Sequence, residues 1–184
     1  MATSILPICS IACIARPARA GEVDELTALA LRSKAHWGYG QDFLDRCRPL
    51  LTVTEADLAA KLLLVADDGG PLGFAGLAGP PPVGELTDLW VEPAVLGRGI
   101  GRLLFRHAVQ AAREAGMTAL RIEAEPNAVG FYRAMGADPA GETPSGLVAD
   151  RWLPVLRYRL EPHGSGSDEP ARRAGGPPAG AGTG

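Results

Sequence analysis

A glycine-dense segment between a predicted strand and a predicted helix most constrains the fold of this chain. It reads Leu96-Gly97-Arg98-Gly99-Ile100-Gly101. The strand is predicted at residues 86–91, and the amphipathic helix that follows stops near Gly116. Glycine lets the backbone turn sharply, and the first amides of a helix have no partner inside it. Because these amides point toward phosphate oxygens, the segment predicts a site for a nucleotide-like diphosphate.

Three known phosphate loops compete for this segment. A nucleoside triphosphatase loop needs a Lys-Ser/Thr pair after its last glycine, and none follows Gly101. A dinucleotide-binding fingerprint would place its third glycine at Arg102, and no βαβ unit brackets the segment convincingly. The segment instead resembles motif A of the Gcn5-related N-acetyltransferases (GNAT), Gln/Arg-x-x-Gly-x-Gly/Ala, with Leu96 at the Gln/Arg position.

A second motif lies at the distance that the GNAT family predicts. Residues 127–137 are similar to the family's second signature, in which an Asn follows a strand and a Phe-Tyr pair lies on the next helix. Here these residues are Asn127, Phe131 and Tyr132. The order and spacing of the two motifs agree, and the resemblance covers roughly residues 85–137.

The resemblance implies a GNAT fold of the α/β (α+β) type, with a mixed, mostly antiparallel central sheet flanked by helices on both faces. It also implies an acyltransferase that takes its acetyl group from acetyl-coenzyme A, without a metal. The residues implied in coenzyme binding are Leu89, Trp90, Val91, Gly97, Arg98, Gly99, Ile100, Gly101, Arg102, Asn127 and Tyr132.

Acetyl transfer needs a base for the amine and an acid for the departing thiolate. The resemblance implies Tyr132 as the acid, against the alternative that its ring only packs the helix on the sheet. It implies Glu85 as the base, with Asp88 and Glu123 as rivals. A carboxylate would need a raised pKa or a water relay to act as a base near neutral pH.

An aromatic stretch follows the first predicted helix and contains His36, Trp37 and Tyr39. These side chains frame either an acceptor pocket or a wedge in the core. We expect transfer to a primary amine of a small molecule by direct attack in a ternary complex. The alternatives are acetylation of a protein or peptide amine and a non-catalytic sensor that binds coenzyme A.

Composition excludes several other classes. A chain of 184 residues with 46% hydrophobic content suits one sizeable core, and a net charge of -3 gives no footprint for nucleic acid. Three cysteines and three histidines are scattered without a metal-binding spacing. The apolar residues 5–15 are too short to span a bilayer. We therefore expect a cytoplasmic protein with no membrane or nucleic-acid partner. The family resemblance in addition implies a possible homodimer through residues 147–160.

Periodicity predicts the remaining elements and the domain limits. Strands are predicted at residues 11–16, 62–66, 73–78, 120–124, 147–150 and 152–160, and helices at residues 20–32, 41 to about 50 and 127–136. Pro154 predicts an edge position or a bulge for the last strand. We expect an extension at residues 1–10, the acetyltransferase domain at 11–161 and a disordered Gly/Pro-rich tail at 162–184.

Overall fold

The computed structural model of the chain describes residues 13–146 and 151–160 and centres on one mixed sheet. Within these residues, seven strands lie in the order β1-β2-β3-β4-β5-β7-β6, and only β4 and β5 pair in parallel. The strands are β1 (Ile14–Pro17), β2 (Leu62–Asp67), β3 (Pro71–Ala78), β4 (Val83–Val91), β5 (Ala119–Glu123), β6 (Asp138–Pro144) and β7 (Trp152–Arg159). The helices are α1 (Val23–Ala35), α2 (Gln41–Leu51), α3 (Glu55–Ala60), α4 (Ile100–Glu114) and α5 (Val129–Ala134). The predicted fold class is confirmed.

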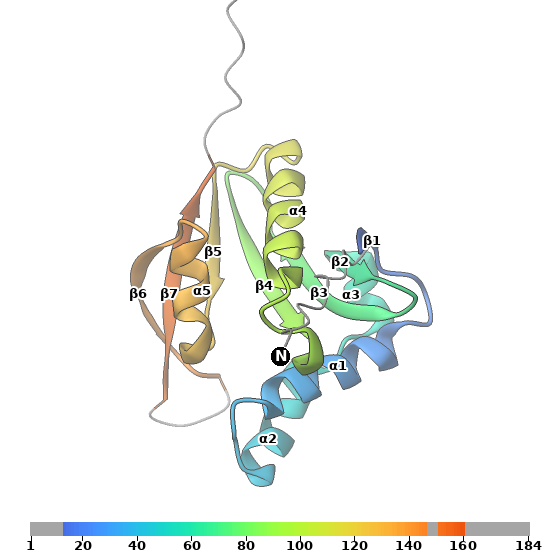
Figure 1. Cartoon of the computed structure of the whole chain (residues 1–184). Helices are drawn as coiled ribbons and strands as arrows, with labels where there is room; N and C mark the ends of the chain where they lie inside the picture. The colour runs from blue at the N-terminus through green and yellow to red at the C-terminus, as the bar shows by residue number, and fades with distance from the viewer. Residues whose placement is uncertain (1–12, 147–150, 161–184) are drawn as a thin grey trace, which may run out of the picture.

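Alternation along the central strands sends apolar side chains to both faces of the sheet. Leu63 and Val65 of β2 join the cluster that packs against α1 and α2, whereas Leu64 and Ala66 join the cluster beneath α4. In Figure 1, α4 and α5 lie in front of the sheet. Each face therefore has its own hydrophobic core.

The strands β4 and β5 pair over four residues only, from Val83 opposite Ala119 to Leu86 opposite Ile122. Beyond this point β4 continues beside β3, and the two parallel strands diverge (Figure 1). With α4 between them they form a βαβ unit, so the expectation that no such unit brackets the glycine segment is wrong. The reason is that β4 begins at Val83, inside the proline-rich stretch, and thus reaches β5.

The helix α4 begins directly after the glycine segment and is amphipathic, as predicted. Ile100, Leu104 and Phe105 are buried on its inner face, and the helix ends at Glu114, close to Gly116. No helix in the described part of the chain is long and apolar enough to cross a membrane.

The N-terminal half shows one element that periodicity did not predict. The helix α3 has six residues, too few for a periodic signal, and a capping box begins it. The Asp57 amide donates to the Thr54 hydroxyl at 3.2 Å, and the Asp57 carboxylate accepts from the Thr54 amide at 2.8 Å. The first helix spans Val23–Ala35 instead of residues 20–32.

The C-terminal strands differ from the prediction. Residues 147–150 lie outside the described residues, and β7 pairs with β6, whose glycine and prolines hide the strand pattern. Pro154 lies in β7 between β5 and β6, so the edge position is wrong. The register instead shifts in β6, between Pro139 and Gly141. The domain limits, the cytoplasmic location and the dimer stay predictions.

Candidate functional site

The loop between β4 and α4 leaves backbone amides available to a ligand. Gly97 and Gly99 have φ values of +76° and +89°, which residues with a side chain rarely adopt. Added Cβ atoms at these glycines would meet nothing within 4 Å, so the need for glycine arises from conformation and not from crowding. Gly99 is the N-cap of α4 and offers no side-chain cap, so the first amides of the helix point outward.

A cavity of about 350 Å³ extends from this loop to α1 through the gap between β4 and β5. It is lined by all but one of the residues predicted to bind the coenzyme, and Arg98 is the exception. The lining members of that set are Leu89, Trp90, Val91, Gly97, Gly99, Ile100, Gly101, Arg102, Asn127 and Tyr132. The amide of Asn127 donates to the Glu125 carboxylate at 3.3 Å.

The three residues predicted to bind the acceptor lie in different surroundings. Trp37 lines the cavity and is 40% exposed. The His36 and Trp37 rings pack in a T-shaped arrangement with their centroids 5.4 Å apart, but His36 lies outside the cavity lining. Tyr39 is also outside the lining, and its hydroxyl donates to Glu125.

The candidate acid, Tyr132, lies on α5 with its ring in the core against Phe105 and Phe131. It also lines the cavity. Burial raises the pKa of Tyr132 above its usual value, and the nearby charge of Asp88 adds to the increase. The hydroxyl therefore keeps its proton at neutral pH. The packing role and the proton-donor role are compatible in this geometry.

The three candidate bases occupy distinct positions. Glu85 is 54% exposed at the side chain, 4.0 Å from Arg121, and lies outside the cavity lining. Asp88 is only 12% exposed and forms an ion pair with Lys61 at 3.0 Å, also outside the lining. Glu123 lines the cavity, is 44% exposed and accepts from Arg121 at 2.5 Å. Of the three, Glu123 alone reaches the cavity wall.

The sequence profile of the acetyltransferase (GNAT) family matches residues 26–137, well over half of the chain. The chain belongs to the GNAT family. The matched residues extend from α1 to the end of the α5 segment, so they contain the glycine loop, the divergent strands and Tyr132.

Curated relatives match less than half of the chain. A peptidyl-lysine N-acetyltransferase of Salmonella typhimurium is 37% identical over 79 residues, which cover 43% of this chain and 50% of that protein. A chloroplastic serotonin N-acetyltransferase of Oryza sativa is 38% identical over 69 residues, or 37% of this chain and 34% of that protein. The chain thus spans half the length, or less, of these relatives.

A solved GNAT structure matches nearly its whole length. The N-acetyltransferase of Thermoplasma acidophilum, solved in complex with coenzyme A, has a TM-score of 0.68 and 19% identity. The match covers 80% of this chain and 98% of that one. At this identity the likeness establishes the GNAT fold alone.

One polar cluster at the α1 end of this cavity was not predicted. Glu125, just past β5, lines the cavity and forms ion pairs with Lys34 of α1 and, at 3.6 Å, with Arg151. Burial raises the pKa of Glu125, but hydrogen bonds from Lys34 and Tyr39 outweigh it and hold the pKa below its usual value. Lys34 and Arg151 are far from Glu125 in sequence. The only sequence signal was a second glutamate two residues after Glu123.

Proposed function

We propose that this GNAT protein transfers an acetyl group from acetyl-coenzyme A to a primary amine of a small molecule, by direct attack in a ternary complex. The observation that carries the proposal is the continuous cavity that joins the glycine loop to Tyr132 and Glu123. A phosphate-binding loop, a proton donor and a carboxylate thus border the same space.

The coenzyme fits the residues at one end of the cavity. The amides at Gly99, Ile100 and Gly101 would hold its pyrophosphate, because they begin α4 without internal partners. Arg102 lines the cavity beside them and would contact a phosphate. Asn127 would bind the pantetheine arm. The match to a structure solved with coenzyme A supports this placement.

The donor supplies an activated thioester carbonyl. The amine nitrogen forms a bond to the carbonyl carbon, the carbon–sulfur bond breaks, and the thiolate needs a proton. Tyr132 donates that proton, since its hydroxyl is protonated at neutral pH and the residue lines the cavity. An amide among Leu89, Trp90 and Val91, which all line the cavity, stabilises the carbonyl oxygen.

The proton released by the amine needs an acceptor. We propose Glu123, because its carboxylate lines the cavity on the strand that diverges from β4. Glu85 stays a candidate through a water relay, since its exposed carboxylate lies on the same face of the sheet, near Arg121. Substitution of each glutamate by glutamine separates the two roles.

A second candidate is acetylation of a peptide amine. Trp37 lines the cavity and is 40% exposed, so part of the wall is accessible to a larger substrate, and the Salmonella relative is a peptidyl-lysine N-acetyltransferase. A lysine-containing peptide in the acceptor screen tests this candidate directly.

Calorimetric titration with acetyl-coenzyme A tests the proposed function. We expect saturable binding that Gly99→Glu abolishes, because the new carboxylate repels the pyrophosphate and strains a backbone at φ +89°. Gly69→Glu is the matched control: Gly69 has φ +78° in the β2–β3 turn and lies outside the cavity lining. Amine-dependent thiol release by the wild type completes the test. A folded wild type that binds no acetyl-coenzyme A contradicts the proposal.

A further inference from the structure

The strand β4 contains a bulge at the point where it leaves β5. On the β3 side, Gly76 lies opposite Asp88 and Leu77 opposite Leu86, so Thr87 has no partner in β3. On the β5 side, pairing ends at Leu86. Such a bulge lets successive side chains approach one another, and here the Thr87 hydroxyl donates to the Asp88 carboxylate at 2.9 Å.

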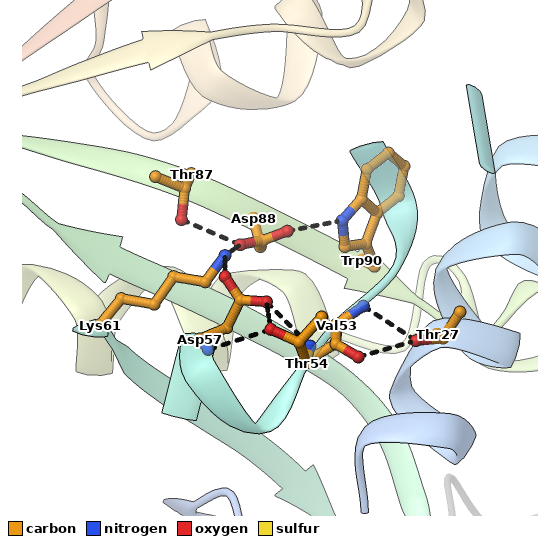
Figure 2. Close-up of polar contacts among 8 residues, drawn as sticks. All are labelled: Thr27, Val53, Thr54, Asp57, Lys61, Thr87, Asp88 and Trp90. Atoms are coloured by element: carbon orange, nitrogen blue, oxygen red, sulfur yellow. Dashed lines mark hydrogen bonds and ion pairs between the residues drawn. The ribbon is translucent and has the colours of Figure 1, made fainter. Parts of the chain in front are cut away.

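Asp88 lies behind the cavity wall and holds two residues of that wall. Its carboxylate accepts from Thr87 and, at 3.3 Å, from the Trp90 indole N–H. Thr87 and Trp90 line the cavity, whereas Asp88 does not. Figure 2 shows the carboxylate between these two side chains, with the Lys61 ammonium beside it.

Lys61 fixes Asp88 from the other side. Its ammonium donates to Asp88 at 3.0 Å and lies 3.3 Å from Asp57, the residue of the α3 capping box (Figure 2). Burial lowers the pKa of Lys61, but the charges of Asp88 and Asp57 outweigh it and keep the pKa above its usual value. The lysine therefore stays charged and donates to the Asp88 carboxylate, which also accepts from Thr87 and Trp90.

The opposite strand leaves room for this arrangement. A Cβ at Gly76 of β3 would lie 2.6 Å from the Thr87 hydroxyl oxygen and would also collide with Asp88. Gly76 thus permits both polar side chains to lie on one face of the sheet.

The direction of the Thr87 hydrogen bond decides what its hydroxyl recognises. A threonine hydroxyl has one proton and two lone pairs, and Asp88 takes the proton. Toward a ligand in the cavity, the Thr87 oxygen can then act only as a hydrogen-bond acceptor. A primary amine is an N–H donor. Glu123 is the last residue of β5 and lines the cavity; it follows Ile122, which pairs with Leu86, the residue before Thr87.

We infer that Thr87 binds the amine substrate, because its hydroxyl oxygen accepts a hydrogen bond from the amine N–H. Asp88, held by Lys61, is the positioning residue that orients the Thr87 hydroxyl. This inference rests on the proposed function and adds how the amine is recognised. It assigns Asp88 a role other than that of the base.

Thr87→Val tests the hydroxyl with the shape retained. We expect the KM for the amine to rise about tenfold, because one hydrogen bond to a charged or strongly polar donor is lost. The Kd for acetyl-coenzyme A should change less than twofold. Thr87→Ser should restore the amine KM. Thr143→Val on β6 is the matched control and should change neither value. An unchanged amine KM in Thr87→Val overturns the inference.

A double-mutant cycle tests the role of Asp88. Asp88→Ala frees the Thr87 proton and should raise the amine KM several-fold, but in the Thr87→Val background its further effect should be clearly smaller, because only the Trp90 contact is then lost. Lys61→Met serves as a second variant that leaves the carboxylate in place, and we expect a smaller rise. Independent, multiplying effects of Asp88→Ala and Thr87→Val contradict the positioning role.

A binding measurement separates this inference from the proposed function. The complex with coenzyme A is titrated with tryptamine, chosen because Trp37 and Trp90 line the cavity, and the Thr87 amide and Trp90 indole NMR signals are followed. We expect both signals to shift, with about tenfold weaker binding in Thr87→Val. Equal binding to both proteins, or no binding to the wild type, overturns the inference. Failure to bind coenzyme A contradicts the proposed function instead.

Discussion

The two ends of the cavity are built in different ways. The proposed coenzyme end is built mainly from one continuous segment, residues 89–102, and the contacts proposed for the pyrophosphate are backbone amides at Gly99, Ile100 and Gly101, where α4 begins. The proposed acceptor end consists of side chains from α1, β4, β5 and the segments that follow α1 and β5, and the ion pairs of Asp88 and Glu125 hold it. A backbone site requires a local conformation, whereas a side-chain site requires distant segments to meet. The two ends should therefore respond differently to substitution.

The largest expected effect is on stability at the acceptor end. Glu125→Gln leaves Lys34, whose side chain is 11% exposed, without its buried partner. We expect a loss of about 3 kcal/mol in the free energy of unfolding, measured by denaturant titration. Acetyl-coenzyme A binding by the folded variant should change less than threefold.

The Arg32–Glu92 ion pair provides the control for that variant. Arg32 is half exposed, so Arg32→Met should cost less than about 1 kcal/mol. Equal losses of unfolding free energy in Glu125→Gln and Arg32→Met would contradict a special structural role for the buried Glu125–Lys34 ion pair.

The next effect is on catalysis, where the two ends meet. Tyr132→Phe keeps the ring in the core but removes the proton donor, so we expect kcat to fall about 100-fold with both KM values nearly unchanged. Thiol release measures this. Tyr158→Phe, whose ring packs on Phe105 outside the cavity, should have no such effect. A fully active Tyr132→Phe enzyme would assign Tyr132 to packing alone.

A smaller effect distinguishes the two arginines at the coenzyme end. Arg102 lines the cavity and Arg98 does not. We expect Arg102→Ala to weaken acetyl-coenzyme A binding about fivefold, less at high salt, because an exposed charge contact contributes about 1 kcal/mol. Arg98→Ala should change the Kd less than twofold in calorimetry. A larger effect at Arg98 would mean that the loop rearranges around the ligand.

The smallest expected effect is a pH dependence of stability. The pKa of Glu125 lies below its usual value in the folded chain, so its contribution is complete above the unfolded pKa near 4.5 and is lost as the pH falls through the folded pKa. Denaturant titrations between pH 6 and about pH 3 should show a steeper loss in the wild type than in Glu125→Gln. Parallel curves would contradict the stabilising role of the ionised carboxylate.

How much of the molecule was predictable differs between the two ends. The glycine segment and the Asn127, Phe131, Tyr132 signature predicted the family, the fold class and a coenzyme end whose residues, Arg98 apart, line the cavity. At the acceptor end, only Trp37 of the three predicted residues lines the cavity. Tyr39 instead supports Glu125, a contact between residues 86 positions apart.

Strand predictions failed where side-chain patterns were weak. The Pro- and Gly-rich residues of β6 form a strand because β7 supplies a partner, and nothing in their alternation indicates this. The same holds for the first residues of β4, which become a strand because β5 lies beside them. Pairing in both cases comes from the neighbour and not from local propensity.

Local chain chemistry was enough to specify the glycine loop, the amphipathic α4 and the alternating core strands, because φ preferences, helix periodicity and strand periodicity act over a few residues. Tertiary structure decided the divergence of β4 from β5, the bulge at Thr87 and the partners of Asp88 and Glu125. Those features depend on which strands become neighbours and which buried charges find a counter-ion. Contacts of this kind join segments that no local pattern relates.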